Sequence, residues 1–550
     1  MRTLFAVLAL SAVVGCDQAP VVEAPAPDPA GPAENAIQEA ALVQHLQALS
    51  SDQMEGRAPA TPGGQRAADY IADQLKAIGV EPAGENGTYF QQVPIVESVV
   101  NRAFTLSVPG RSYRYLEDVV AFSGTEQARA HVQGEVVFVG HGIVAPEQKW
   151  NDYAGANVRG KWVLIMVNDP PATAEEPQLF AGKALTYYGR WTYKFEEAAQ
   201  QGAAGAILIH TDESATYPWQ VVQSSWSGTQ YSLPPAEGVP TLAVKAWMTN
   251  EAASDLVRRG GQNLDRLRAV APTRGFKPVT LQVRAAATLQ QRTSRKTSPN
   301  VIGVVRGTND EQGVVFTSHY DHFGMRDPQP GEAADADRIF NGAVDNASGV
   351  AGLLLIAQSM AGADGRPGRS MYFVFTTAEE SGLLGAEYFA QHPVIPMDRV
   401  AANINVDGIN YLGPTRDIVL LGADRSTLGP LAETLAQERG RVIGEDQYPE
   451  RGYFFRSDHF PLAKAGVPAL SISSPREFIG PDAEELRKKQ DAYNATHYHQ
   501  PSDEYDPTWS FAGAVEDLKF LAQLAWRIAA QDEMPRYNEG DQFANARAAS

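Results

Sequence analysis

The chain has 550 residues, a formal net charge of −19 at pH 7 and a sequence pI near 5.0. This length exceeds that of one ordinary domain and predicts two or three. No Lys/Arg-rich run offsets the acidity, which argues against a nucleic-acid-binding protein. The composition is that of an acidic globular protein.

The N-terminus is typical of an export signal. A basic start at Arg2 precedes an apolar run over residues 4–14 that is too short to span a bilayer, and Cys16 closes it. The segment resembles a bacterial lipoprotein signal, which implies cleavage and lipidation at Cys16; a plain secretory peptide is the alternative. Since Cys16 is the only cysteine, the mature protein would have no disulfide and no thiolate ligand. We expect an exported protein on the periplasmic or cell-surface side, held at the membrane only by a lipid anchor.

Residues 17–35 are rich in Pro and Ala and predict an extended tether. Within residues 36–103, apolar residues then recur at intervals of three and four, which predicts two amphipathic helices between residues 36 and 79. The loop between these helices, residues 55–64, is dense in Gly and Pro.

Residues 104–290 change to short, strand-like apolar runs. The main runs are Val136–Val139, Trp162–Val167, Ala206–Ile209 and Thr241–Val244. One helix, Tyr193–Gln201, is expected between them. We interpret this segment as a separate β-rich module inserted into the chain. Its exposed aromatic residues could pack in its core or line a substrate approach; they are Trp191, Trp219 and Trp226.

An α/β stretch follows over residues 291–535, and metal-capable side chains come where its predicted strands end. His319 follows the run 314–317, Glu379 and Glu380 follow 371–376, and Asp407 follows 402–406. A fourth strand is predicted over 468–473. In open α/β sheets ligands bind beyond the carboxyl ends of the strands, so we expect these residues in one crevice. A helix over 512–529 ends the stretch, and residues 531–550, including the polar tail 536–550, are predicted to be frayed.

Six residues carry the chemistry: His319, Asp345, Glu379, Glu380, Asp407 and His499. Two imidazoles and several carboxylates without sulfur suit Zn²⁺, with Mn²⁺ or Co²⁺ possible. A two-metal centre needs one bridging carboxylate and two terminal ligands for each ion, which leaves one carboxylate over. Because Glu379 and Glu380 are neighbours, their side chains diverge; one can bind metal while the other acts as general base on a metal-bound water. Asp321 is placed to accept the second ring N–H of His319.

Six motifs in order are similar to those of family M28 metallopeptidases, the co-catalytic zinc aminopeptidases. They are Ser318-His-Tyr-Asp-His-Phe-Gly324, Asn341-Gly-Ala-Val-Asp-Asn-Ala-Ser-Gly349, Thr377-Ala-Glu-Glu-Ser-Gly382, Asn405-Val-Asp-Gly408, Arg456-Ser-Asp-His459 and Tyr498-His-Gln-Pro-Ser-Asp503. The resemblance covers residues 300–530, and the helices before Gly79 match the usual N-terminal part. It implies an α/β, three-layer mixed-sheet zinc exopeptidase domain (phosphorylase/hydrolase-like). Residues 104–290 resemble an inserted protease-associated domain.

The resemblance also implies roles. His319 and Asp407 would bind one zinc, Glu380 and His499 the other, and Asp345 would bridge them. Glu379 would be the general base, Asp321 the orienter of His319, Tyr498 a donor to the oxyanion and Arg456 a substrate contact. The family implies a cis peptide between Asp345 and Asn346.

Several residues keep alternative interpretations. His497 rivals His499 as a ligand, although the motif favours His499. His322 and His459 are expected to make supporting hydrogen bonds. Asp345 could also cap the helix that follows it, and Asp503 could orient His499 or cap a turn.

The expected function is a zinc-dependent exopeptidase acting on peptides, foremost an aminopeptidase that uses a metal-bound hydroxide. Carboxypeptidases and dipeptidases of the family share the ligand set and remain the alternative. A glutaminyl cyclase-like transferase, which works with a single zinc, and an inactive binding protein, which would have lost ligands, are less favoured.

Overall fold

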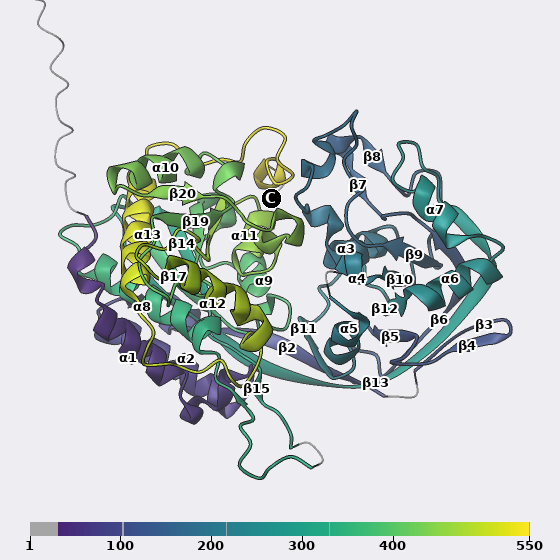
Figure 1. Ribbon diagram of the computed structural model, residues 1–550, viewed down its shortest axis with the longest axis horizontal. Helices are drawn as coiled ribbons and strands as arrows, with labels where there is room; N and C mark the ends of the chain where they lie inside the picture. Colours follow the sequence, from purple (N-terminus) through teal and green to yellow (C-terminus); the bar gives the residue numbers. More distant parts are fainter. Residues whose placement is uncertain (1–30, 102–103, 216, 329–330, 549–550) are drawn as a thin grey trace, which may run out of the picture.

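The computed structural model describes residues 31–101, 104–215, 217–328 and 331–548. The predicted signal, Cys16 and the tether up to residue 30 lie outside the described residues. Figure 1 shows two lobes, joined along one side by the long strand β13 (Val279–Val305). Within the described ranges, no helix has the length and apolar character needed to cross a membrane.

A mixed sheet forms the centre of the first lobe, in the order β13–β17–β14–β18–β21–β19–β20. The further strands are β14 (Asn309–His319), β17 (Arg369–Thr376), β18 (Val400–Asn405), β19 (Asp417–Leu421), β20 (Val442–Gly444) and β21 (Ala469–Ser473). Strands β17, β14, β18 and β21 are parallel, and all eight residues of β17 are buried. The four strands predicted at the metal-capable ends are therefore confirmed.

Helices cover both faces of this sheet (Figure 1). One face packs against α1 (Glu39–Leu49), α2 (Pro62–Ala77), α8 (Gly349–Ala361), α10 (Leu428–Glu438) and α13 (Ala512–Ala530). The other face packs against α9 (Leu384–Gln391) and α11 (His459–Lys464). Nearly every residue of α8 is buried, because α1, α2 and α13 surround it on the sheet. The lobe is a mixed α/β fold with a large mixed sheet.

The second lobe has a sheet of its own, in the order β4–β3–β13–β6–β9–β10–β12–β5. Its strands are β3 (Thr105–Val108), β4 (Arg111–Tyr113), β5 (Val119–Phe122), β6 (Arg129–Phe138), β9 (Trp162–Met166), β10 (Gly205–His210) and β12 (Val244–Thr249). The strand predicted over Thr241–Val244 is wrong in position, since β12 begins at Val244.

The helix predicted over Tyr193–Gln201 is confirmed by α3, but further helices in this lobe were not predicted. Besides α3 (Trp191–Gln200), the described residues form α4 (Asp212–Ala215), α5 (Trp219–Ser225), α6 (Asn250–Arg259) and α7 (Leu264–Val270). Helix α6 buries Ala252, Ala253, Leu256 and Val257, and the Thr249 side chain caps its N-terminus. These four positions have the spacing of one helix face, so the sequence carried a periodic signal that our prediction missed.

Strand β13 belongs to both lobes. Its first part pairs with β6, residues 291–301 pair with β2 (Phe90–Val100), and its end pairs with β17. Strand β11 (Thr229–Ser232), from the inserted segment, pairs with the other edge of β2. The predicted boundary at residues 290 and 291 thus lies inside one continuous strand.

The predicted fraying of residues 531–550 is wrong for the described part. Tyr537 and Phe543 are 7% and 6% exposed and join an apolar cluster with Phe454, Phe455 and Phe460. Asp541 pairs with Arg425 at 2.8 Å. Single aromatic residues anchor this tail, so no periodic pattern in the sequence marks it as ordered.

Candidate metal centre

The carboxylate of Asp345 lies between two imidazoles. Its Oδ1 is 3.3 Å from Nε2 of His319, and its Oδ2 is 3.2 Å from Nε2 of His499. His319 ends β14, whereas Asp345 lies just before α8 and His499 follows α12 (Ala483–Thr496). Residues 180 positions apart therefore meet around one aspartate, at the carboxyl ends of the parallel strands.

The other predicted carboxylates complete two groups. Asp407, after β18, lies 3.2 Å from Nε2 of His319, and Glu380, after β17, lies 3.2 Å from Nε2 of His499. Glu379 approaches His319 and Glu380 closely enough for the ligand atoms of all three to lie within 4.8 Å of one another. All six predicted residues are thus brought together, with Asp345 in the middle.

His322 belongs to the same cluster. Its Nδ1 lies 2.6 Å from Oε1 of Glu380, and it forms a possible ligand group with Asp345 and Glu380. We favour His499 as the ligand because its Nε2 faces both Asp345 and Glu380, whereas His322 makes the supporting hydrogen bond expected of it. His497 points elsewhere, to the carbonyl oxygen of Ser502 at 2.8 Å. His459 is buried against the Phe454 ring, 4.8 Å between centroids.

The electrostatics of the cluster demand positive charge. Burial disfavours protonation of His319, yet the carboxylates of Glu379 and Asp407 raise its pKa well above the usual value. Burial likewise opposes charge on His499, but Glu380 and Asp345 raise its pKa to about 10. Burial by itself would raise the pKa of Asp345, and the two imidazoles hold it well below its usual range. Four carboxylates around two imidazoles need cations nearby.

Asn346 ties the ligand segments together. Its side-chain Nδ2 lies 3.1 Å from the carbonyl oxygen of His319 and 3.2 Å from that of Val406. Its Oδ1 accepts the backbone N–H groups of Gly349 and Gly408, at 3.0 and 2.8 Å. One buried amide therefore holds the backbone on both sides of Asp407 and next to His319. The peptide between Asp345 and Asn346 is cis, as the family resemblance implied.

Asp321 is next to His319 but contacts it differently from our expectation. The ring Nδ1 lies 3.2 Å from the backbone carbonyl of Asp321 and 3.9 Å from its carboxylate. The carboxylate instead accepts the backbone N–H of Glu379 at 3.0 Å. Burial raises the pKa of Asp321 to about 7. Asp321 thus links the segment of His319 to that of Glu379.

Asp503 supports the bridging residue, not His499. Its carboxylate accepts the backbone N–H groups of Val344 and Asp345, both at 3.1 Å, and the hydroxyl of Tyr493 at 3.0 Å. Neither interpretation from the sequence anticipated this contact, because Asp345 and Asp503 are distant in the chain.

Arg57 lies buried beneath the cluster. Its guanidinium donates to the carbonyl oxygens of Tyr320, Leu49, Asn341 and Gly342, at 2.5 to 3.0 Å. Burial lowers its pKa to about 10, although the carboxylates of Asp503 and Asp321 oppose this shift. The sequence placed Arg57 only within the loop of residues 55–64; the structure shows a buried cation that fixes the loops bearing the site.

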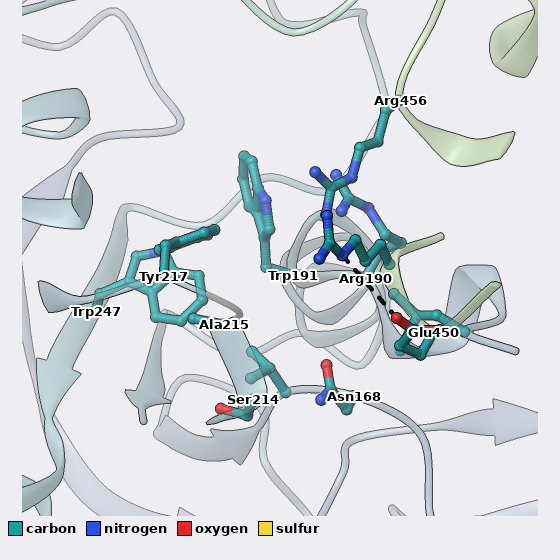
Figure 2. Close-up of a pocket in the computed structure, with 13 residues that line it drawn as sticks. Asn168, Arg190, Trp191, Ser214, Ala215, Tyr217, Trp247, Glu450 and Arg456 are labelled. Carbon is teal, nitrogen blue, oxygen red and sulfur yellow. Dashed lines mark ion pairs between the residues drawn. The ribbon is translucent and has the colours of Figure 1, made fainter. Parts of the chain in front are cut away.

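Aromatic side chains form an exposed rim. Tyr498 is 44% exposed and stacks on His499, 3.7 Å between centroids, and Phe323 is 42% exposed at 4.6 Å from the same ring. Partial burial of this residue, with the carboxylates of Asp345 and Glu380 nearby, raises the pKa of Tyr498. Arg456 lies apart from the cluster and lines a pocket between the lobes (Figure 2).

The donor set fits a pair of zinc ions. Two imidazoles and four carboxylates with no thiolate are ligands that zinc accepts. Nε2 of His499 is buried and has no hydrogen-bond partner, although two carboxylate oxygens lie within 3.2 Å of it. This arrangement suits a lone pair directed at a cation. His319, Asp345 and Asp407 could hold one ion, and His499, Glu380 and Asp345 the other.

One family model and one curated relative match part of the chain. Residues 300–522 match the family model described as Peptidase family M28. A probable zinc metalloprotease of Leptosphaeria maculans is 26% identical over 272 residues, 43% of this chain and 58% of that protein. The chain thus spans less than two thirds of that relative.

Solved structures similar to the chain include an aminopeptidase from Aneurinibacillus sp. strain AM-1, with a TM-score of 0.49 and 19% identity over 91% of this chain and 96% of that one. A zinc aminopeptidase from Bacillus subtilis has a TM-score of 0.42 and 18% identity, covering 92% and 98%.

Proposed function

We propose that the chain, whose residues 300–522 match the model of Peptidase family M28, is a zinc-dependent exopeptidase, and specifically an aminopeptidase that removes N-terminal residues from peptides. The observation that carries this proposal is the position of Asp345, whose two oxygens each face a different imidazole. A carboxylate shared in this way suits a bridge between two metal ions. The description of the Leptosphaeria maculans relative as a zinc metalloprotease supports the choice of zinc.

When bound, two zinc ions would polarise the scissile carbonyl and lower the pKa of a water towards neutrality. Glu379 would accept a proton from that water and donate it to the leaving amine. Burial, with the charge of Glu380 adding to it, raises the pKa of Glu379 well above its usual value, so this carboxyl is suited to hold a proton. The Tyr498 hydroxyl would donate a hydrogen bond to the oxyanion that develops from the carbonyl.

Two features support action at the free N-terminus. A protonated substrate amine needs acidic partners, and the cluster supplies four carboxylates while the chain carries a net charge of −19. The exposed rings of Phe323 and Tyr498 would contact an apolar side chain next to the scissile bond.

A panel of aminoacyl-7-amido-4-methylcoumarins and N-blocked peptides, assayed with and without chelator, tests the proposal. We expect turnover of the free-amine substrates, its loss on chelation and its recovery with zinc. Hydrolysis of blocked or C-terminal substrates alone would identify a carboxypeptidase instead. Pyroglutamate formation from Gln-peptides with a single zinc would identify a cyclase.

We also propose that Cys16 is lipidated after export and that residues 104–290 are a protease-associated domain. Mass spectrometry of the mature N-terminus tests the first proposal: a diacylglyceryl cysteine is expected, and cleavage elsewhere without lipid would refute it.

A further inference from the structure

A small pocket lies where the inserted lobe (residues 104–290) meets the first lobe. The inserted lobe contributes Asn168, Arg190 and Trp191 to its lining. The first lobe contributes Glu450, Arg451 and Arg456. Figure 2 shows Arg190 and Arg456 reaching into this space from opposite lobes. The two lobes are held together beside it by Leu185, whose backbone N–H donates to the carbonyl of Pro449 at 2.9 Å.

The pocket is lined with hydrogen-bond donors that have no partner. The Nε atoms of Arg190 and Arg456 are buried and unpaired, as is Nε1 of Trp247, a side chain only 2% exposed. Among the described residues, neither Arg190 nor Arg456 forms an ion pair with a carboxylate. The carboxylate of Glu450 lies 4.0 Å from Arg451 and is largely exposed. Every unsatisfied group named here is a donor, so the missing partner is an acceptor.

Two like charges are also held close together. Burial, and next to it the charge of Arg456, lower the pKa of Arg190 to about 10. Arg190 immediately precedes α3, so the positive end of the helix dipole adds to the two guanidinium charges. Such a concentration of positive charge in a protein of net charge −19 is costly unless an anion neutralises it.

The floor of the pocket is rigid. Asn168 has a left-handed backbone, φ 67°, and its carbonyl oxygen accepts from Nζ of Lys194 at 3.1 Å and contacts Nδ1 of His141 at 2.9 Å. Lys194 is fully buried, and its charge is offset by Asp169 and Asp152. These buried groups fix the Asn168 backbone from behind, which presets the shape of the pocket.

We propose that Arg190 and Arg456 form a carboxylate-binding subsite that selects peptide substrates by a negative charge downstream of the scissile bond. Arginine binds a carboxylate with two parallel hydrogen bonds, which suits two guanidinium groups whose Nε atoms have no partner. The carboxylate is the C-terminus of a short peptide or the side chain of an Asp or Glu residue. This inference rests on the proposed peptidase function, because it assigns the downstream part of that substrate.

The chain connects this subsite to the metal centre. Arg456 is two residues from Asp458, which is fully buried and close enough to His319 and Asp407 for their charges to affect its pKa. Two residues of extended chain span at most about 7 Å. The backbone of Arg456 therefore lies on the short segment whose next buried carboxylate, Asp458, senses the charges of the metal centre.

Ligand binding without turnover tests the subsite by itself. Trp191 and Trp247 line the pocket, so its occupation should change the tryptophan fluorescence. We expect N-acetyl-alanine to give a saturable change that N-acetyl-alaninamide does not give, and Arg190→Gln to abolish the response. N-acetyl-aspartic acid α-amide, which carries only the side-chain carboxylate, distinguishes the two sources of charge. Equal responses to acid and amide, or a response unchanged in Arg190→Gln, would overturn the proposal.

Kinetics test the same site in the working enzyme. For Ala-Ala-Ala with a free C-terminus, Arg190→Gln should raise KM about ten- to hundredfold with kcat within about twofold, and it should leave the C-terminal amide unaffected. Arg159→Gln removes the same charge from an exposed position of the same lobe and should change neither substrate. An equal effect of Arg190→Gln on acid and amide would refute the subsite. If the wild-type protein hydrolyses no peptide, the proposed function fails while the fluorescence titration still decides the subsite.

Discussion

The side-chain amide of Asn346 donates to the carbonyl oxygen of His319 over 3.1 Å, although the residues are 27 positions apart. Asn346 directly follows Asp345, so one residue carries the shared carboxylate and the next fixes a neighbouring ligand segment. The same amide holds Val406 and Gly408, which flank Asp407. One buried side chain thus fixes the backbone beside the ligands at two strand ends, those of β14 and β18.

Asn346→Ala should therefore destabilise the protein and weaken metal binding. Each buried group left without its partner costs about 1–3 kcal/mol, so we expect a loss of roughly 3 kcal/mol or more. Urea unfolding and zinc content by mass spectrometry measure the two effects. Asn538→Ala, which removes one exposed hydrogen bond to Asp424, is the control and should cost less than about 0.5 kcal/mol. Full zinc content and unchanged stability in Asn346→Ala would contradict this role.

Glu379→Gln should keep the bound metal but lose most of the turnover. The substitution preserves the shape of the side chain but removes the base. General acid–base catalysis contributes about 10²- to 10⁴-fold, so we expect kcat to fall by that factor. Both kcat and zinc content should be measured on the variant and on the wild type, purified in parallel. A variant that turns over normally would assign the proton transfer to another group, and one that loses zinc would make Glu379 a ligand.

His499→Ala should lose one metal ion, whereas His322→Ala should retain both. The reason is that Nε2 of His499 faces both Asp345 and Glu380, while His322 contacts Glu380 through a hydrogen bond. Zinc stoichiometry after dialysis measures the difference. If His322→Ala loses an ion and His499→Ala does not, the two histidines exchange roles.

The free energy of unfolding should decrease as the pH falls from 7 to 5, because His141 is buried in its neutral form. Burial lowers the pKa of His141 to about 3, while the unfolded chain has the ordinary value of about 6.5. Between these values the unfolded state binds one more proton, so stabilisation is complete above about pH 6.5 and is lost as the pH falls. Going from pH 7 to pH 5 should cost about 2 kcal/mol through this residue.

Urea midpoints at pH 7 and pH 5 for wild type and His141→Gln test that prediction. The variant should lose less stability between the two pH values, whatever its absolute stability. His131→Gln, at an exposed histidine of the same lobe, serves as the control and should follow the wild type. An identical pH dependence in His141→Gln would show that the residue is not buried in the neutral form.

Sequence alone predicted the parallel strands and the cluster, because apolar runs such as Met371–Thr376 end directly in charged residues. It could not predict the support of Asp345 by Asp503, since that contact depends on how the segment after α12 returns to the sheet. Nor could it predict that Arg57, a residue of a Gly- and Pro-rich loop, is buried. Its guanidinium donates to four backbone carbonyl oxygens that come together only in the folded protein.

The inserted lobe and the tail were predicted less well for a different reason. Helix α6 buries mainly alanines and single aliphatic residues, and the tail is held by isolated aromatic residues such as Tyr537. The buried positions of α6 are spaced as on one helix face and could have been recognised, whereas the single aromatic residues of the tail leave no periodic pattern. The pocket around Arg190 and Arg456 likewise exists only because the two lobes meet, which no local pattern records.

The central claim is that two zinc ions share Asp345, and anomalous diffraction from the zinc-loaded protein at the zinc edge tests it most directly. The account predicts two peaks about 3.5–4 Å apart, each within about 2.0–2.2 Å of one Asp345 oxygen, one beside His319 and the other beside His499. A single peak, or peaks that Asp345 does not touch, would contradict it.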